Sequence, residues 1–170
     1  MSIATAARRV GLLLKASGRK VVFAESCTGG LVSGALTRTP GISNFHCGGM
    51  VVYRNETKMA YLDIPAEMFV RPGPVSAEVA ALMARKVLDK TPEADLAVSV
   101  TGHLGPNAPP KLDGRVYAAI ARREPKARRP ALPAAHSLQC RRGDSRVVRQ
   151  RWVVEQVLNL LADELEEAND

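Results

Sequence analysis

The sequence of 170 residues has few aromatic residues, few cysteines and no long apolar run. Aromatic side chains make up 4% of it and apolar residues 46%, so we expect a mostly aliphatic core. No segment approaches the roughly 20 consecutive apolar residues of a membrane-spanning helix, and residues 1–20 alternate apolar and basic residues rather than resembling a signal sequence. Three cysteines at unrelated spacings indicate neither a disulfide framework nor a zinc site. We therefore expect a cytoplasmic protein without membrane association, with reduced thiols and without a bound metal.

Positive charge is in excess, with a formal net charge of +7. Clustered Lys and Arg residues bind nucleic-acid backbones, so this excess raises the question whether the protein binds nucleic acid. Much of it lies in residues 122–130, which prolines interrupt, and in arginines between 141 and 151. A solvated basic loop and the start of a helix explain this distribution better than a nucleic-acid site. Nucleic acid is therefore not the partner we expect.

Short apolar segments alternate with amphipathic ones along the whole chain. The spacing predicts helices over 3–17, about 28–38, a short one capped by Asn55, one capped by Ser76, and one closing the chain from about 145. Strands are predicted over 21–24, 49–53, 96–100, 115–121 and about 134–141, and residues 65–74 as a linker. This alternation is typical of an α/β fold, and we expect residues 1–170 to form a single domain.

The stretch AESCTGG, residues 24–30, follows a predicted strand and precedes a predicted helix. Ser26 would then lie at a sharp strand-to-helix turn, where free backbone N–H groups can hold a phosphate or a developing oxyanion. This is a suitable position for a serine nucleophile. The alternative is that Ser26 or Thr28 is a helix N-cap.

A serine nucleophile needs a base. Of the three histidines, only His103 lies in a loop that follows a strand. Lys58 is the other candidate, because a desolvated lysine can lose its proton near neutral pH, although most lysines on helices are solvated. Cys27 is a rival nucleophile or simply a small buried side chain, and Tyr53 is a core residue or part of the site.

Several stretches together resemble one family, the C-terminal domain of competence/damage-inducible protein A, which is also found alone as nicotinamide mononucleotide deamidase. The resemblance covers nearly the whole chain, and we expect the stand-alone form, without the molybdopterin-binding-like N-terminal domain. The stretches that carry it are AESCTGG at 24–30, TPGIS at 39–43, GGMVVYRNETKMAYL at 48–62, GPVS at 73–76, VSVTG at 98–102 and GD at 143–144.

The resemblance implies a three-layer α/β/α sandwich with a mixed central sheet and a homo-oligomer. It also implies hydrolysis of the carboxamide of nicotinamide mononucleotide to nicotinate mononucleotide and ammonia, without a metal or other cofactor. Ser26 and Lys58 match the family's catalytic pair, and Tyr53 matches the tyrosine that would orient the pair or face the pyridinium ring. The expected substrate contacts are Cys27, Thr28, Gly29, Gly30, Asn55, Thr101, Gly102 and Arg149, with Arg149 meeting the phosphate.

The chain departs from the family pattern in residues 102–114, where a glycine-rich loop is replaced by a shorter one with several prolines, and at Ser145, where an arginine is usual. Glycine allows close backbone approach to a ligand, so we expect a reshaped ribose or phosphate subsite. His103 in this loop either contacts substrate or is a surface histidine. The rival hypotheses are the same chemistry on a different amide, a catalytically silent nucleotide-binding module, and a nucleic-acid binder that would need Arg128 and Arg129.

Overall fold

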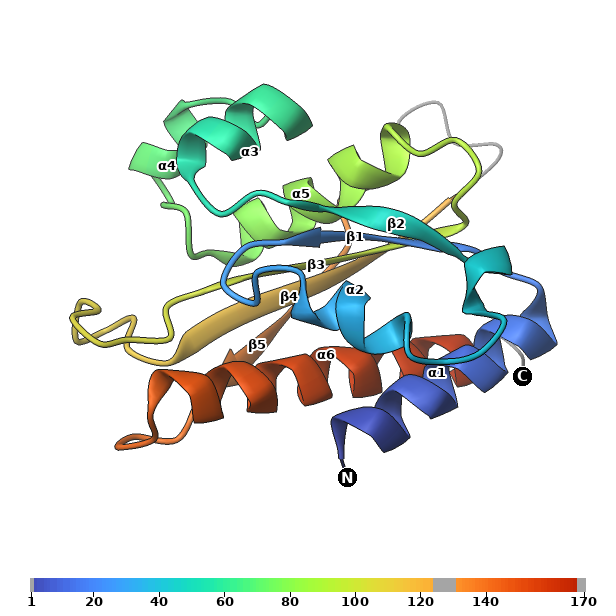
Figure 1. The fold of residues 1–170 in the computed structure, drawn as a ribbon. Helices are drawn as coiled ribbons and strands as arrows, with labels where there is room; N and C mark the ends of the chain where they lie inside the picture. The colour runs from blue at the N-terminus through green and yellow to red at the C-terminus, as the bar shows by residue number, and fades with distance from the viewer. Residues whose placement is uncertain (1, 124–130, 168–170) are drawn as a thin grey trace.

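A five-stranded sheet organises the protein, whose computed structural model describes residues 2–123 and 131–167 (Figure 1). The strands lie in the order β2-β1-β3-β4-β5, so the first strand of the chain is an interior one. Their bounds are β1 Val21–Glu25, β2 His46–Val51, β3 Leu96–Gly102, β4 Arg115–Arg122 and β5 Ala135–Gln139.

The sheet is mixed. Strands β2, β1 and β3 run parallel, whereas β4 and β5 are antiparallel to their neighbours. The carboxyl ends of β1, β2 and β3 and the start of β4 therefore meet at one edge, on the left in Figure 1. In open α/β sheets, ligands bind in the crevice at this edge.

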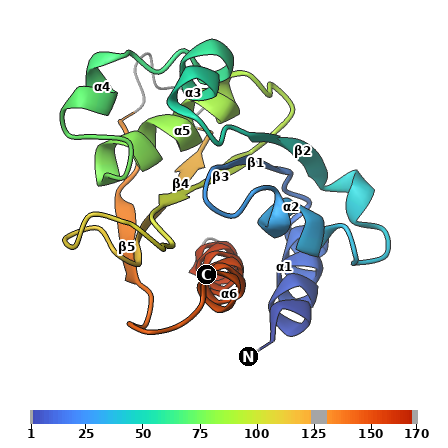
Figure 2. The same ribbon diagram turned by 60° about the vertical axis from the view of Figure 1, so that its left-hand side comes forward.

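Helices cover both faces, which gives the three layers that the family resemblance implies (Figure 2). One face carries α1, α2 and α6, and the other carries α3, α4 and α5. Their bounds are α1 Ile3–Ser17, α2 Leu31–Leu36, α3 Asn55–Leu62, α4 Glu67–Val70, α5 Ala77–Asp89 and α6 Arg146–Glu167, with a 3-10 turn at Ile42–Asn44.

The two-residue period of a strand divides the core between these layers. In β1, Val21 and Phe23 pack with α1, α2 and α6, whereas Val22 and Ala24 pack with α5. Because β1 lies inside the sheet with helices on both sides, all five of its residues are buried, including the charged Glu25. The polar end of the strand, Glu25, is therefore shielded from solvent.

Most expected elements are present, with changes at their ends. Gly18 ends α1 in a left-handed conformation and the Ser76 hydroxyl caps α5, as predicted. Three expectations were wrong: the second helix is only Leu31–Leu36, residues 65–74 contain α4, and Asn55 lies inside α3, whose N-cap is Arg54. The basic stretch with Arg128 and Arg129 lies largely outside the described residues.

Candidate functional site

The turn after β1 places Ser26 at the edge of the sheet. The Ser26 backbone N–H donates to the Val100 carbonyl at 3.0 Å, which ties the turn to β3. Gly29 and Gly30 have φ values of 65° and 94°, which side-chain-bearing residues rarely adopt, and Gly29 N–H closes the turn onto the Ser26 carbonyl at 3.0 Å. The two glycines are therefore required by the turn itself.

A buried carboxylate holds the following helix in place. Glu25, 2% exposed, accepts hydrogen bonds from the Thr28 hydroxyl (2.6 Å) and from the backbone N–H groups of Gly30, Val32 and Ser33 (3.0, 3.1 and 2.7 Å). Glu25 therefore occupies the positive end of α2, and the N-cap position belongs to Gly30. Neither Ser26 nor Thr28 is the N-cap, and the N-terminus of α2 is not free to hold a ligand.

Lys58, in helix α3, lies next to the Ser26 side chain. In α3 it lies one turn before Leu62, on the buried face, so its side chain points inward. Lys58 is 2% exposed, and its Nζ lies 3.1 Å from Ser26 Oγ. The Tyr53 carbonyl lies 3.5 Å from both of these atoms. A serine hydroxyl, a buried amine and one carbonyl thus form a compact polar cluster between β1 and α3.

Burial lowers the pKa of Lys58 below its ordinary value, because the charged ammonium loses hydration. The nearby Cys27 and Glu56 oppose this shift. In the described part of the chain, no carboxylate forms an ion pair with Lys58. Lys58 is therefore suited to accept a proton from Ser26.

Tyr53 contributes its backbone rather than its phenol to this cluster. The side chain is 54% exposed, and its hydroxyl accepts a 2.7 Å hydrogen bond from Arg146 Nη2. We expected the phenol to orient the serine and the lysine. In the structure the Tyr53 carbonyl contacts these two side chains instead. Asn55, at the start of α3, is half-buried beside this loop.

Two backbone N–H groups follow Ser26 in this turn. Among the described residues, neither the N–H of Cys27 nor that of Thr28 donates to a backbone carbonyl, whereas that of Gly29 closes the turn and that of Cys27 interacts with its own thiol. Burial raises the pKa of the Cys27 thiol to about 12, so this thiol stays protonated and is a poor nucleophile at neutral pH. The pKa argues against Cys27 as the rival of Ser26.

Thr101 and Gly102 have structural partners at the end of β3. The Thr101 hydroxyl donates to the Pro74 carbonyl at 2.9 Å. A Cβ on Gly102 would lie 2.6 Å from Val116 Cγ2 and 2.9 Å from the Arg115 carbonyl, so close packing against β4 requires this glycine. The expected polar contact between Thr101 and a nucleotide would therefore have to compete with an existing hydrogen bond.

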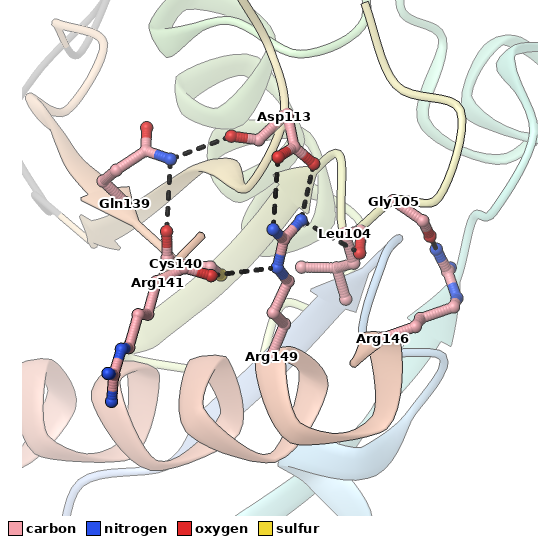
Figure 3. A network of polar contacts seen from close by, with 8 residues as sticks. All are labelled: Leu104, Gly105, Asp113, Gln139, Cys140, Arg141, Arg146 and Arg149. Atoms are coloured by element: carbon pink, nitrogen blue, oxygen red, sulfur yellow. Dashed lines mark hydrogen bonds and ion pairs between the residues drawn. The ribbon is translucent and has the colours of Figure 1, made fainter. Parts of the chain in front are cut away.

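Arg149 lies in a polar network between α6 and the 102–114 loop (Figure 3). It is 5% exposed, and its guanidinium binds both carboxylate oxygens of Asp113 at 2.5 and 3.1 Å. Further hydrogen bonds go to the Leu104 and Arg141 carbonyls. This pairing holds the pKa of Asp113 below its usual range. Arg149 therefore fastens the 102–114 loop to α6, which leaves its donors committed rather than free for the expected phosphate.

Sequence reasoning missed three residues that border this site. Glu25 was quoted only as part of the AESCTGG stretch. Gln150 donates to the Cys27 and Thr28 carbonyls at 3.1 and 3.5 Å, and Arg146 donates to Tyr53 Oη and, at 2.6 Å, to the Gly105 carbonyl. The i, i+4 spacing of Arg146 and Gln150 was a signal that both share one face of α6.

Among the described residues, no histidine side chain forms a hydrogen bond with the Ser26 hydroxyl. His46 Nδ1 accepts from the Gly48 N–H and its Nε2 contacts Ser33 Oγ, each at 2.8 Å, while burial lowers the pKa of the ring. His136 is exposed on β5. The backbone of His103 pairs with Arg115 and Gly114 in the altered loop, so a substrate contact by its side chain stays a prediction.

An open groove elsewhere does not include this site. It lies between α1, α2 and α6, has a volume of about 1330 Å³, and includes Gly11, Leu31 and Trp152 in its lining, but neither Ser26 nor Lys58. Within residues 2–123 and 131–167, no group of three His, Cys, Asp or Glu side chains is placed to hold a metal ion. No helix in the described residues is both long and apolar enough to cross a membrane.

Comparison with known sequences finds one family. A family model described as the CinA C-terminal domain matches residues 3–165. A CinA-like protein of Desulfotalea psychrophila is 44% identical over 119 residues, which are 69% of this chain and 29% of that protein. A second CinA-like protein, from Citrifermentans bemidjiense, is 43% identical over 66% of this chain and 27% of its own length. The chain thus spans less than a third of these relatives.

Solved structures share the fold over its full extent. The competence/damage inducible protein CihA from Agrobacterium tumefaciens is 32% identical with a TM-score of 0.82, covering 96% of this chain and 95% of that one. A CinA superfamily protein from Klebsiella pneumoniae has a TM-score of 0.88 at 23% identity, covering 98% and 99% of the two chains. At that identity, the second comparison speaks for the fold alone.

Proposed function

The chain belongs to the family of CinA C-terminal domains, and from this premise we propose that it is an amidohydrolase that uses Ser26 and Lys58. The proposed substrate is nicotinamide mononucleotide, the products are nicotinate mononucleotide and ammonia, and the proposed location is the cytoplasm. The observation that carries the proposal is the 3.1 Å approach of a buried lysine to a serine hydroxyl at the edge of the sheet where the parallel strands end.

The first half of the proposed reaction forms an acyl-enzyme. Neutral Lys58 takes the proton of the Ser26 hydroxyl while its oxygen attacks the carboxamide carbon. The N–H groups of Cys27 and Thr28 stabilise the negative oxygen of the tetrahedral intermediate. Protonated Lys58 then gives its proton to the departing nitrogen, so ammonia leaves and an ester to Ser26 remains.

The second half reverses these roles. Water attacks the ester carbonyl while Lys58 accepts its proton, and the same N–H groups hold the new oxyanion. Lys58 returns the proton to Ser26 as the carboxylic acid leaves, which restores the starting enzyme. The Tyr53 carbonyl keeps the amine and the hydroxyl together throughout, because it contacts both. No metal ion is needed in this scheme, since the lysine supplies the base.

Ammonia release from nicotinamide mononucleotide tests the proposal directly. We expect turnover by the wild type and a loss of about a thousandfold or more in Ser26→Ala and in Lys58→Met, because each removes a group used in every step. Cys27→Ala is the matched control and should retain activity, since the buried thiol takes no part. Circular dichroism and thermal unfolding establish that each variant is folded.

Two outcomes would contradict this assignment. Activity in Ser26→Ala that disappears in Cys27→Ala would make the thiol the nucleophile. A folded wild type that releases no ammonia from nicotinamide mononucleotide would exclude this substrate. The same assay on a panel of other amides then separates a different substrate from a silent binding module. A different amide is favoured by one observation, the commitment of Arg149 to Asp113 in the altered loop.

A further inference from the structure

Arg146 lies on the face of α6 that packs against the turn at Ser26. Gln150, four residues later and on the same face, donates to the Cys27 and Thr28 carbonyls. One turn earlier, Arg146 reaches across to the Tyr53 hydroxyl, and the carbonyl of this same tyrosine contacts Ser26 and Lys58. The charge of Arg146 also acts on Cys27, where it works against the effect of burial on the thiol pKa. The guanidinium therefore lies beside the proposed site.

The partners of Arg146 are both electrically neutral. Its Nη2 donates to Tyr53 Oη at 2.7 Å and its Nη1 to the Gly105 carbonyl at 2.6 Å (the latter seen in Figure 3). Among the described residues, no carboxylate forms an ion pair with Arg146. Arg149, one turn along α6, is bound to both oxygens of Asp113. Of these two arginines, only Arg146 keeps an uncompensated positive charge.

We propose that Arg146 is the anion-recognising residue of this site and binds the phosphate of a nucleotide amide. This inference rests on the proposed function, which it deepens by assigning the residue that selects a phosphorylated substrate. Phosphate displaces the phenol and the carbonyl because it carries the opposite charge and its oxygens can accept two parallel hydrogen bonds from the planar guanidinium. Tyr53 and Gly105 hold the guanidinium in place until the substrate arrives.

Binding to a Ser26→Ala protein tests this role without depending on turnover. Isothermal titration with nicotinamide mononucleotide and with nicotinamide riboside, which lacks the phosphate, measures the contribution of that group. In this background, Arg146→Gln is expected to weaken the mononucleotide about 10- to 100-fold while changing riboside affinity less than about twofold. Arg146→Lys keeps a charge but not the planar fork, so its affinity should be intermediate.

Arg142→Gln is the matched control, because it removes the same charge from an exposed residue in the turn before α6. It should leave the affinity for both ligands within about twofold of the parent protein. Tyr53→Phe removes one neutral partner of Arg146 and keeps the backbone carbonyl. Since the phosphate displaces that hydroxyl, Tyr53→Phe should bind the mononucleotide at least as tightly as the parent does.

The inference is overturned if Arg146→Gln weakens both ligands equally, if it changes neither, or if the parent protein does not bind the mononucleotide. If Arg146→Gln does not fold, Tyr53→Phe decides, and weaker mononucleotide binding in that variant contradicts displacement of the hydroxyl. Failure of the proposed function has a different signature. Phosphate-dependent binding that needs Arg146, with no ammonia release by the wild type, would sustain the inference and exclude the deamidase.

Discussion

At the scale of single residues, Lys58 determines how the proposed activity should depend on pH. The base is the neutral amine, so kcat/KM should rise with pH through a single group whose pKa lies below the ordinary lysine value of 10.5. Glu56 is one of the groups that raise the pKa of Lys58. Glu56→Gln should therefore move the rise to lower pH, which a pH profile of ammonia release measures. A profile that Glu56→Gln leaves unmoved, or moves to higher pH, would contradict this account.

Glu25 makes a second prediction at this scale, concerning stability. Its carboxylate accepts four hydrogen bonds in a buried position, so Glu25→Ala leaves three backbone N–H groups and one hydroxyl without their partner. Losses of this kind cost about 1–3 kcal/mol for each unsatisfied group, and we expect the free energy of unfolding to fall by about 3 kcal/mol or more. Urea denaturation measures this.

The exposed Glu56 provides the comparison, because the one side-chain hydrogen bond that Glu56→Ala breaks in the described structure is a surface ion pair with Arg54. We expect that variant to lose about 0.5 kcal/mol or less. Equal losses in Glu25→Ala and Glu56→Ala would show that the carboxylate does not hold the start of α2. If the turn at Ser26 kept its structure in Glu25→Ala, we would also expect that variant to keep its full activity.

At the scale of elements, the junction of β3 and β4 depends on close backbone packing at Gly102. A Cβ there would lie 2.6 Å from Val116 Cγ2 and 2.9 Å from the Arg115 carbonyl, so Gly102→Ala should lower the free energy of unfolding by about 1–3 kcal/mol. Gly34, inside α2, has no neighbouring atom within 4 Å of its Cβ position. Gly34→Ala should thus be stabilising by about 0.5–1 kcal/mol. Opposite signs in thermal unfolding are expected, and a neutral Gly102→Ala would contradict the packing argument.

The same scale shows which elements sequence could predict. Helices 3–17 and 77–89 repeat apolar residues every three to four positions and have clear end signals in Gly18 and Ser76, so local chemistry determines them. Residues 28–30 also follow a helical pattern. They form a turn instead, because the Glu25 carboxylate binds the N–H groups of Gly30, Val32 and Ser33. That interaction spans up to eight residues and depends on the burial of β1, which periodicity does not record.

The candidate site also has parts that the sequence could predict and parts that it could not. Ser26 and Lys58 could be proposed from their positions after predicted strands and from the family resemblance. Their approach to 3.1 Å depends on parallel pairing of β1 and β2. The resemblance assigned the phosphate to Arg149, but sequence could not distinguish Arg149 from Arg146, because both lie near the start of the same helix and differ only in their neighbours. Asp113, which commits Arg149, comes from a loop 36 positions earlier in the chain.

At the scale of the whole molecule, the net charge of +7 gives the proposed site a long-range bias toward anions. Arg146 is positive beside the proposed site, whereas Asp113 is neutralised by Arg149. The positive charge of the protein could thus serve to attract an anionic substrate rather than nucleic acid. The homo-oligomer that the resemblance implies stays a prediction, which sedimentation analysis can check.

Salt dependence of the proposed reaction follows from this bias. Nicotinamide mononucleotide is a net anion through its phosphate, whereas nicotinamide riboside is a cation. Because salt screens charges over about 10 Å at 0.1 M, kcat/KM for the mononucleotide should fall about two- to tenfold between 0.05 and 0.5 M sodium chloride. The riboside, if it is hydrolysed, should show no fall or a small rise, since screening removes its repulsion. Equal decreases for both substrates would indicate a general effect of salt on the enzyme rather than attraction of the anion.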